Sequence, residues 1–369
     1  MVNSRSWLIV LAVIIWMYGC EKGRESELEF NDQMVLIYIA ANNDLKPEAL
    51  ASVNELERGY RDGLNLLVYL KTSSEVSVIL KIKADDTPDI GSDTIAIYGN
   101  ENSSDPYFLS RVVNDARKLS PASSYGLVLW SHASSWAPPL EIRLKSFGQD
   151  NGLEMDIVDL KQALPSDFRY IIFDACSMAS IEAIYEMKNN ARYILASPTE
   201  VLSSSYPYGQ IVQYLFGGKE ELIKIGQSFI SYYQSLGGEY ASATVSLIDT
   251  DSLSLLARKM KVLLSSKSLK VGFDKSVLQR LDFDPNSRVK AYDYLDFLRK
   301  GFEPEDYDVI MKQLNATILY KNSTTAFLNN PITEFSGLSI YLPDARDPLH
   351  PYYSMLQWYG DGGMSALFN

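Results

Sequence analysis

Short, continuous apolar runs alternate with amphipathic stretches along most of this chain. Three of these runs are MVLIYIAA (34–41), YGLVLW (125–130) and RYIIFD (169–174), and none shows the regular polar alternation of a strand with one solvated face. Strands that are apolar throughout need cover on both faces, which is typical of a parallel sheet between two layers of helices. The chain is therefore predicted to form an α/β core.

The remaining elements follow the same alternation. Further strands are expected at 64–70, 76–83, 192–197, 243–249 and 337–342, and helices at 47–59, 107–119, 156–164, 178–190 and 219–235. After residue 250 the pattern becomes helical, with helices expected at 250–265, 287–300 and 304–316. We expect a core at 34–249 and a mostly helical C-terminal portion at 250–369 that packs on it.

The N-terminus has the pattern of a targeting segment. Arg5 precedes an apolar stretch, WLIVLAVIIW (7–16), that is too short to span a bilayer and fits a secretory signal. A glycine, Cys20 and a charged run follow, an arrangement that resembles a bacterial lipoprotein cleavage site. We expect a signal peptide at 1–19, acylation of Cys20, a polar tether at 20–33, and export to a bacterial cell envelope with a lipid anchor. The alternative is an ordinary signal peptide with an incidental cysteine.

The net charge limits the classes of partner. A formal charge of −12 argues against nucleic acid or anionic lipid as the main partner, although an acidic surface attracts basic peptides. We therefore expect no nucleic acid and a membrane contact only through the N-terminal lipid. A monomer is also expected.

A cysteine and a histidine each follow a predicted buried strand. Cys176 comes directly after the strand at 169–174, and His132 comes directly after the strand at 125–130. Ligands of open parallel sheets bind outside the carboxyl ends of the strands, so neighbouring strands would bring both side chains into one crevice. A thiol beside an imidazole supplies a thiolate nucleophile and a general acid for a leaving amine.

Each residue also has a plainer interpretation. A small cysteine after a strand is commonly an apolar filler, and a single histidine near a loop is usually structural. The second histidine, His350 in DPLHPYY, is assigned a structural role. If Cys20 is acylated, Cys176 is the one remaining thiol and has no disulfide partner within the chain.

The sequence offers little for a bound cofactor. Two histidines and one mature thiol cannot supply a closed zinc site of the usual kind, and no phosphate-binding glycine loop is present. The turns at 42–44 (Asn-Asn-Asp) and 150–151 (Asp-Asn) are rich in oxygen and suit calcium, but ordinary turns have the same composition. We expect no required cofactor and no catalytic metal, with calcium as an open alternative.

Several segments resemble the clostripain family of cysteine peptidases. IIFDACSMASIEAIYE resembles the family's nucleophile segment, where a strand ends in Asp-Ala-Cys and runs into a helix, and YGLVLWSHASSW resembles its histidine segment. VLIYIAANNDLKPEAL, ASPTEVLSSSYPY and SGLSIYLP resemble further family segments in the same order. Caspase-like peptidases share this order of histidine before cysteine. The resemblance implies a caspase-like three-layer sandwich with a mostly parallel central sheet.

The resemblance also assigns roles to individual residues. It implies that Cys176 is the nucleophile, that His132 protonates the leaving amine, and that the N–H groups of Ala133 and Cys176 form the oxyanion hole. Asp174 matches the family's acidic residue in the pocket for the side chain preceding the cleaved bond (P1), which favours Arg or Lys; capping the next helix is its other role.

This chain departs from the family pattern at two places. Ala133 replaces the usual glycine after the histidine, which preserves the N–H unless the position needs a positive φ. In the loop at 203–205, Ser-Ser-Ser stands where some relatives carry a second acid, and this loss would weaken the preference for a basic P1 residue.

A cleavage site is expected between the two catalytic segments. The stretch WAPPLEIRLKSFGQDNG carries Arg143 and Lys145 between a proline pair and a glycine, and exposed loops are preferred cleavage sites. Because some relatives cut themselves in this region, we hypothesise self-cleavage after Arg143 or Lys145. The alternative, favoured by the apolar anchors Leu144 and Phe147, is an uncut loop.

Three functions remain in competition. The first is a secreted, lipid-anchored cysteine endopeptidase that cleaves peptides or proteins after Arg or Lys. The second, motivated by Ala133 and the serine loop, is a catalytically weak surface protein that binds peptides. The third is another thiol hydrolase, such as an amidase or a peptide ligase.

Overall fold

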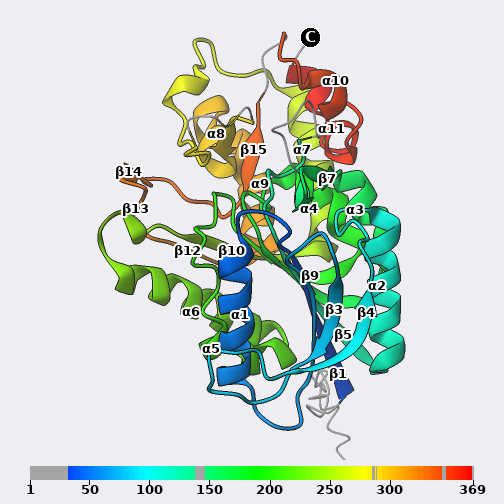
Figure 1. The fold of residues 1–369 in the computed structure, drawn as a ribbon. Coiled ribbons are helices and arrows are strands. Elements are labelled where there is room, and N and C mark those ends of the chain that lie inside the picture. Colours follow the sequence, from blue (N-terminus) through cyan, green and yellow to red (C-terminus); the bar gives the residue numbers. More distant parts are fainter. Residues whose placement is uncertain (1–31, 138–145, 285–286, 288, 343–345, 368–369) are drawn as a thin grey trace, which may run out of the picture.

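A nine-stranded sheet forms the centre of the computed structural model, which describes residues 32–137, 146–284, 287, 289–342 and 346–367 (Figure 1). The strand order is β12 (Ile318–Ser323), β10 (Thr244–Asp249), β9 (Ala191–Ala196), β8 (Phe168–Asp174), β5 (Ser124–Trp130), β1 (Gln33–Ala40), β2 (Asn65–Lys71), β3 (Ser77–Lys81) and β4 (Asp93–Tyr98). Strands β2, β1, β5, β8 and β9 pair in parallel, whereas the strands at both edges pair antiparallel.

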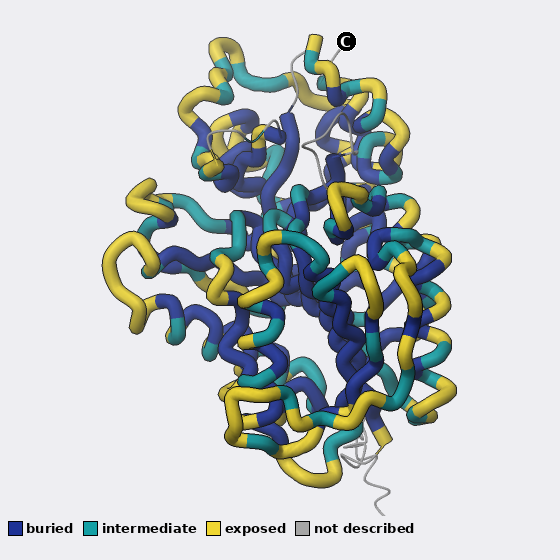
Figure 2. The backbone as a smooth tube through the Cα atoms, viewed as in Figure 1, coloured by how far each residue is buried: buried dark blue, intermediate teal, exposed yellow. Residues whose placement is uncertain are grey.

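Helices cover both faces of this sheet. On one face lie α1 (Lys46–Gly59), α5 (Tyr208–Ile211) and α6 (Lys219–Leu236); on the other lie α2 (Pro106–Leu119), α3 (Ile157–Ala163), α4 (Ile181–Glu186), α7 (Leu253–Ser266) and α9 (Pro304–Thr317). The C-terminal helices α8 (Tyr294–Gly301), α10 (His350–Tyr353) and α11 (Gln357–Asp361) lie beyond the end of the sheet and share the hydrophobic core of the second set. Successive residues of β1 alternate between the two cores, with Leu36 and Tyr38 in one and Val35 and Ile37 in the other. Every residue of β1 is buried, so the continuous apolar run reflects cover on both faces (Figure 2). The predicted fold class is confirmed.

The edges and the C-terminal portion differ from the predicted elements. Strands β4 and β12 were not predicted, and β12 extends the central sheet from the C-terminal part of the chain. The helix expected at 287–300 was wrong in its first part: the chain forms β11 (Ala291–Asp293), and α8 begins only after it. The Asp293 carboxylate accepts hydrogen bonds from the N–H groups of Leu295 and Asp296, and this cap starts the helix there.

Strand β15 (Ser339–Tyr341) ties the C-terminal portion to the segment after Cys176. It pairs antiparallel with β11, in a small sheet separate from the central one. The Ser339 N–H donates to the Ala179 carbonyl at 3.1 Å, and the Tyr341 N–H donates to the Glu182 carboxylate at 2.9 Å.

None of the described helices combines the length and apolar content needed to cross a bilayer.

Candidate active site

The candidate nucleophile and its histidine lie at the ends of two paired strands. Strands β5 and β8 are parallel neighbours, and their register pairs Trp130 with Asp174. His132 and Cys176 each come two residues after this pair, so they leave the sheet at the same level of the same edge. Both line one cavity of about 180 Å³, together with Asp174. The structure thus brings together residues that the sequence placed only at separate strand ends.

Cys176 is a free, partly buried cysteine in a backbone turn. Its Sγ accepts a hydrogen bond from the Val201 N–H at 3.3 Å, and the next residue, Ser177, has a φ of 59°. The Ser177 N–H donates to the Thr199 carbonyl at 2.8 Å, which holds the chain in this left-handed turn. Burial raises the pKa of the Cys176 thiol to about 12. The resting thiol is therefore protonated at neutral pH, and a base has to remove its proton during any nucleophilic step.

The imidazole of His132 contacts a carboxylate. Its Nε2 lies 2.7 Å from Oδ1 of Asp44, in the turn between β1 and α1. The thiol of Cys176 and the imidazole make no hydrogen bond with each other among the contacts of the described chain. Both groups therefore line one cavity, with no hydrogen bond between them among the described contacts.

The backbone around Ala133 is held by a short antiparallel bridge. Ala133 is paired with Phe147, the first residue of β6 (Phe147–Asp150). The hydrogen bonds of this bridge run from the Ser134 N–H to the Ser146 carbonyl and from the Gly148 N–H to the His132 carbonyl. The N–H of Ala133 therefore lies outside the bridge. Ala133 is not among the described residues with positive φ, so alanine fits here without the strain that a required glycine would imply.

Asp174 is a buried carboxylate at the wall of the cavity. Its Oδ2 accepts hydrogen bonds from Tyr208 Oη at 2.8 Å and from the hydroxyl of Ser205. Ser205 in turn accepts a hydrogen bond from Trp130 Nε1 at 2.9 Å. Burial raises the pKa of Asp174 to about 6. The carboxyl is thus ionised at neutral pH and presents a negative charge beside the cavity that contains Cys176.

The residues missed by sequence reasoning are Asp44, Tyr208 and Ser205 in its role as a donor. Asp44 lies in the turn at 42–44, for which the sequence suggested only calcium binding as a chemical role. Ser205 lies in the loop at 203–205, which was interpreted as the site of a lost acid. No local sequence pattern predicts the contact of Asp44 with His132 or that of Ser205 with Asp174, because the partners lie on different strand ends or loops.

The two oxygen-rich turns lie against each other. Asn42 Nδ2 donates to Oδ1 of Asp150 at 2.6 Å, and the Ser103 N–H donates to the other carboxylate oxygen at 2.6 Å. Donors thus occupy both oxygens of Asp150, and no group of three or more His, Cys, Asp or Glu side chains suited to a metal occurs among the described residues. Calcium binding stays a prediction, and ordinary turns account for the contacts.

Other predicted site residues lie elsewhere. Cys20, Arg143 and Lys145 are outside the described residues. His350 begins α10 and meets the ring of Tyr359 edge-on, with 5.9 Å between the ring centroids. It does not line the cavity.

Comparisons with known proteins point to one family. A family model described as Peptidase C11, clostripain family, matches residues 37–367. The chain is similar to a secreted C11 cysteine protease from Bacteroides thetaiotaomicron, solved with an irreversible peptide inhibitor, with 26% identity and a TM-score of 0.79 over 90% of this chain and 99% of that one. It is also similar to an inactive zymogen C11 protease from Parabacteroides distasonis, with 31% identity and a TM-score of 0.77 over 89% of this chain and 97% of that one. No match is found among curated proteins.

Proposed function

The chain belongs to the clostripain family of cysteine peptidases, and from this premise we propose that it is an endopeptidase that cleaves after Arg or Lys with Cys176 and His132 as its catalytic pair. The observation that carries the proposal is the register of β5 and β8, which places both residues on one cavity beside the buried carboxylate of Asp174.

The reaction proceeds in two halves. Cys176 Sγ attacks the scissile carbonyl carbon while its proton passes to the imidazole of His132, and the electron pair of the C=O bond moves to oxygen. The N–H groups of Ala133 and Cys176 donate to this oxyanion. When the C=O bond re-forms, the C–N bond breaks, and His132 gives the proton to the leaving amine. Water then attacks the thioester, gives a proton to His132, and releases the carboxylic acid and the Cys176 thiol.

Selectivity for a basic residue rests on Asp174. A guanidinium or ammonium in the cavity would meet a buried carboxylate that is ionised above about pH 6. A hydrogen bond between an ionised donor and an ionised acceptor is roughly twice as strong as one between neutral groups. Two of the donors on Asp174 are the hydroxyls of Ser205 and Tyr208, which can rotate and share the carboxylate with an incoming cation.

Export and processing complete the proposal. Relatives of known structure are described as secreted, in accord with a signal peptide at 1–19, and we assign an envelope location with a lipid on Cys20. Self-cleavage after Arg143 or Lys145 is part of the same proposal, and so is a mechanism that requires no metal.

A weak or inactive peptide-binding protein of the same fold is the second candidate. The raised pKa of Cys176 and the absence of a thiol–imidazole bond among the described contacts favour it. Labelling by an Arg-based acyloxymethyl ketone separates the two, because only a working nucleophile displaces the acyloxy group.

The test is a peptide-library cleavage profile with this label. Wild type should cut after Arg and Lys and should be labelled at Cys176, while Cys176→Ala and His132→Ala should do neither. Cleavage by Cys176→Ala would overturn the assignment. Transfer products in place of hydrolysed ones would identify a peptide ligase instead.

A further inference from the structure

The carboxylate of Asp44 is aimed at His132 from a neighbouring strand end. Strand β1 lies beside β5 in parallel, so the turn after β1 lies next to the segment after β5. Asp44 Oδ1 is 2.7 Å from His132 Nε2. The side chain of Asp44 is 82% exposed, whereas that of His132 is 26% exposed. An exposed ion pair is usually worth little, so its significance depends on how firmly it is held and what it orients.

The turn that carries Asp44 is anchored by its two preceding asparagines. Asn42 Nδ2 donates to Asp150 Oδ1 at 2.6 Å, and Asn43 Nδ2 donates to the Gln149 carbonyl at 2.8 Å. The Leu45 N–H closes the turn by donating to Asn43 Oδ1 at 2.9 Å. These bonds fix the backbone on both sides of Asp44, so its carboxylate is positioned without burial.

The histidine is held from its other side. The Gly148 N–H donates to the His132 carbonyl at 3.0 Å, and the Ser131 hydroxyl donates to the Ala40 carbonyl at 2.6 Å. The second bond joins the ends of β5 and β1. The backbone segments that carry the His132 imidazole and the Asp44 carboxylate are therefore joined by a hydrogen bond.

We infer that Asp44 is a positioning residue that sets the tautomer of His132. An ionised carboxylate only accepts hydrogen bonds, so this contact requires the proton of the neutral imidazole to be on Nε2. The lone pair is then on Nδ1, which becomes the nitrogen that takes the proton of Cys176 and returns it to the leaving amine. The inference rests on the proposed catalytic pair and adds which nitrogen acts and what holds it.

The tautomer can be measured directly. Because the chain has two histidines, 15N-histidine labelling gives few ring signals, and His350 serves as an internal reference. In the full chain carrying Cys176→Ala, at a pH where the imidazole is neutral, His132 should show protonated Nε2 and bare Nδ1. Adding Asp44→Ala should shift the ring to a mixture of tautomers, and Asp44→Glu should restore the Nε2–H form. An unchanged ring spectrum in Asp44→Ala overturns the inference whatever the activity.

Kinetics in the active chain give the second readout. A buried orienting carboxylate in a serine peptidase is worth about 10⁴ in kcat, and Asp44 is exposed, so Asp44→Ala should lower kcat by about 10-fold to 100-fold. KM should stay near its wild-type value, and Asp44→Glu should recover most of kcat. Asp62→Asn, an exposed charge at the far end of α1, controls for net charge and should behave as wild type. A wild-type kcat in Asp44→Ala rejects the positioning role alone, whereas activity in His132→Ala rejects the proposed function itself.

Discussion

Asp174 and Asp293 are both buried carboxylates, yet their surroundings differ in kind. Asp174 is 5% exposed at the end of β8, and Asp293 is 1% exposed at the end of β11. Burial raises the pKa of both groups, to about 6 for Asp174. Burial and the direction of the pKa shift therefore do not distinguish Asp174 from Asp293.

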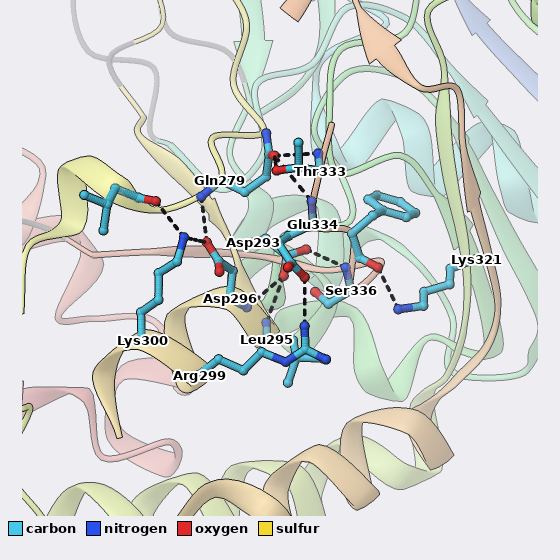
Figure 3. Close-up of polar contacts among 12 residues, drawn as sticks. Gln279, Asp293, Leu295, Asp296, Arg299, Lys300, Lys321, Thr333, Glu334 and Ser336 are labelled. Carbon is cyan, nitrogen blue, oxygen red and sulfur yellow. Dashed lines mark hydrogen bonds and ion pairs between the residues drawn. The ribbon is translucent and has the colours of Figure 1, made fainter. Parts of the chain in front are cut away.

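The donors separate the two regions. Asp293 accepts from the backbone N–H groups of Leu295 at 3.1 Å, Asp296 at 3.0 Å and Ser336 at 2.5 Å. Figure 3 shows this carboxylate inside a cluster that joins the start of α8 to the segment around Ser336. Asp174 accepts chiefly from side chains, the hydroxyls of Ser205 and Tyr208, besides the backbone of Tyr206, and it lines the cavity of Cys176.

The rest of the C-terminal cluster has the same character as Asp293. Gln279 Oε1 accepts from the Thr333 N–H at 2.9 Å, and the Asp296 carboxylate accepts from the Gln279 N–H and from Lys300 (Figure 3). A backbone N–H cannot rotate away from its acceptor, so a carboxylate bound by N–H groups, such as that of Asp293, holds segments of the chain together. Hydroxyl donors can rotate, so a carboxylate held by them remains able to receive a ligand.

The largest expected effect would sharpen this comparison at the proposed nucleophile. Cys176→Ala should lower turnover by many orders of magnitude, while the free energy of unfolding should change by about 1 kcal/mol or less. Initial rates on an Arg peptide and urea unfolding measure the two quantities. His132→Ala should show the same loss of turnover and the same small change in the free energy of unfolding as Cys176→Ala. A stability loss as large as that of a core truncation would place Cys176 with the structural residues.

For Asp293 we expect the reverse: a large loss of stability and no change in substrate selectivity. Asp293→Ala removes a helix cap and leaves a buried N–H of Ser336 without its acceptor, so it should destabilise the fold by about 2–4 kcal/mol. Asp293→Asn should cost less, because its amide oxygen still accepts. The ratio of cleavage after Arg to cleavage after Ala should stay at the wild-type value at a temperature where the variant is folded. A changed ratio would break the distinction between the two carboxylates.

Asp174→Asn should change selectivity more than stability. Losing a charge-assisted contact worth about 1.5–3 kcal/mol should lower kcat/KM for Arg and Lys substrates by roughly 10-fold to 150-fold. Rates on a neutral P1 substrate should change little, and the fold should be retained, since the Asn oxygen accepts from the same hydroxyls. An equal loss on both substrates would remove Asp174 from the P1 pocket.

The smallest effect is the pH dependence set by Asp174. Its pKa of about 6 in the folded protein lies above the ordinary value of 3.8, so the folded state binds this proton more tightly than the unfolded state does. The contribution to stability is complete below about pH 4 and is lost as pH rises towards 6. The preference for Arg over a neutral P1 residue should move the opposite way, rising from pH 5 to pH 7 as the carboxyl ionises. Asp174→Asn should flatten that profile, and a preference independent of pH in wild type would contradict the assigned pKa.

Local sequence pattern was enough for much of the fold. The apolar runs of β1, β5 and β8 predicted buried parallel strands because burial on both faces removes polar alternation. The same pattern placed His132 and Cys176 directly after strand ends. It failed where packing is only partial, as at edge strand β4, whose residues are half-exposed and carry no clear period.

The contacts between distant residues were decided by the tertiary structure. Asp44 is 88 residues from His132, and Ser205 is 31 from Asp174, so no local period relates them. The order and register of β1, β5 and β8 bring these groups together. Periodicity reports which face of a strand is buried, but which strands are neighbours depends on the packing of the whole chain, and that packing assembled the site.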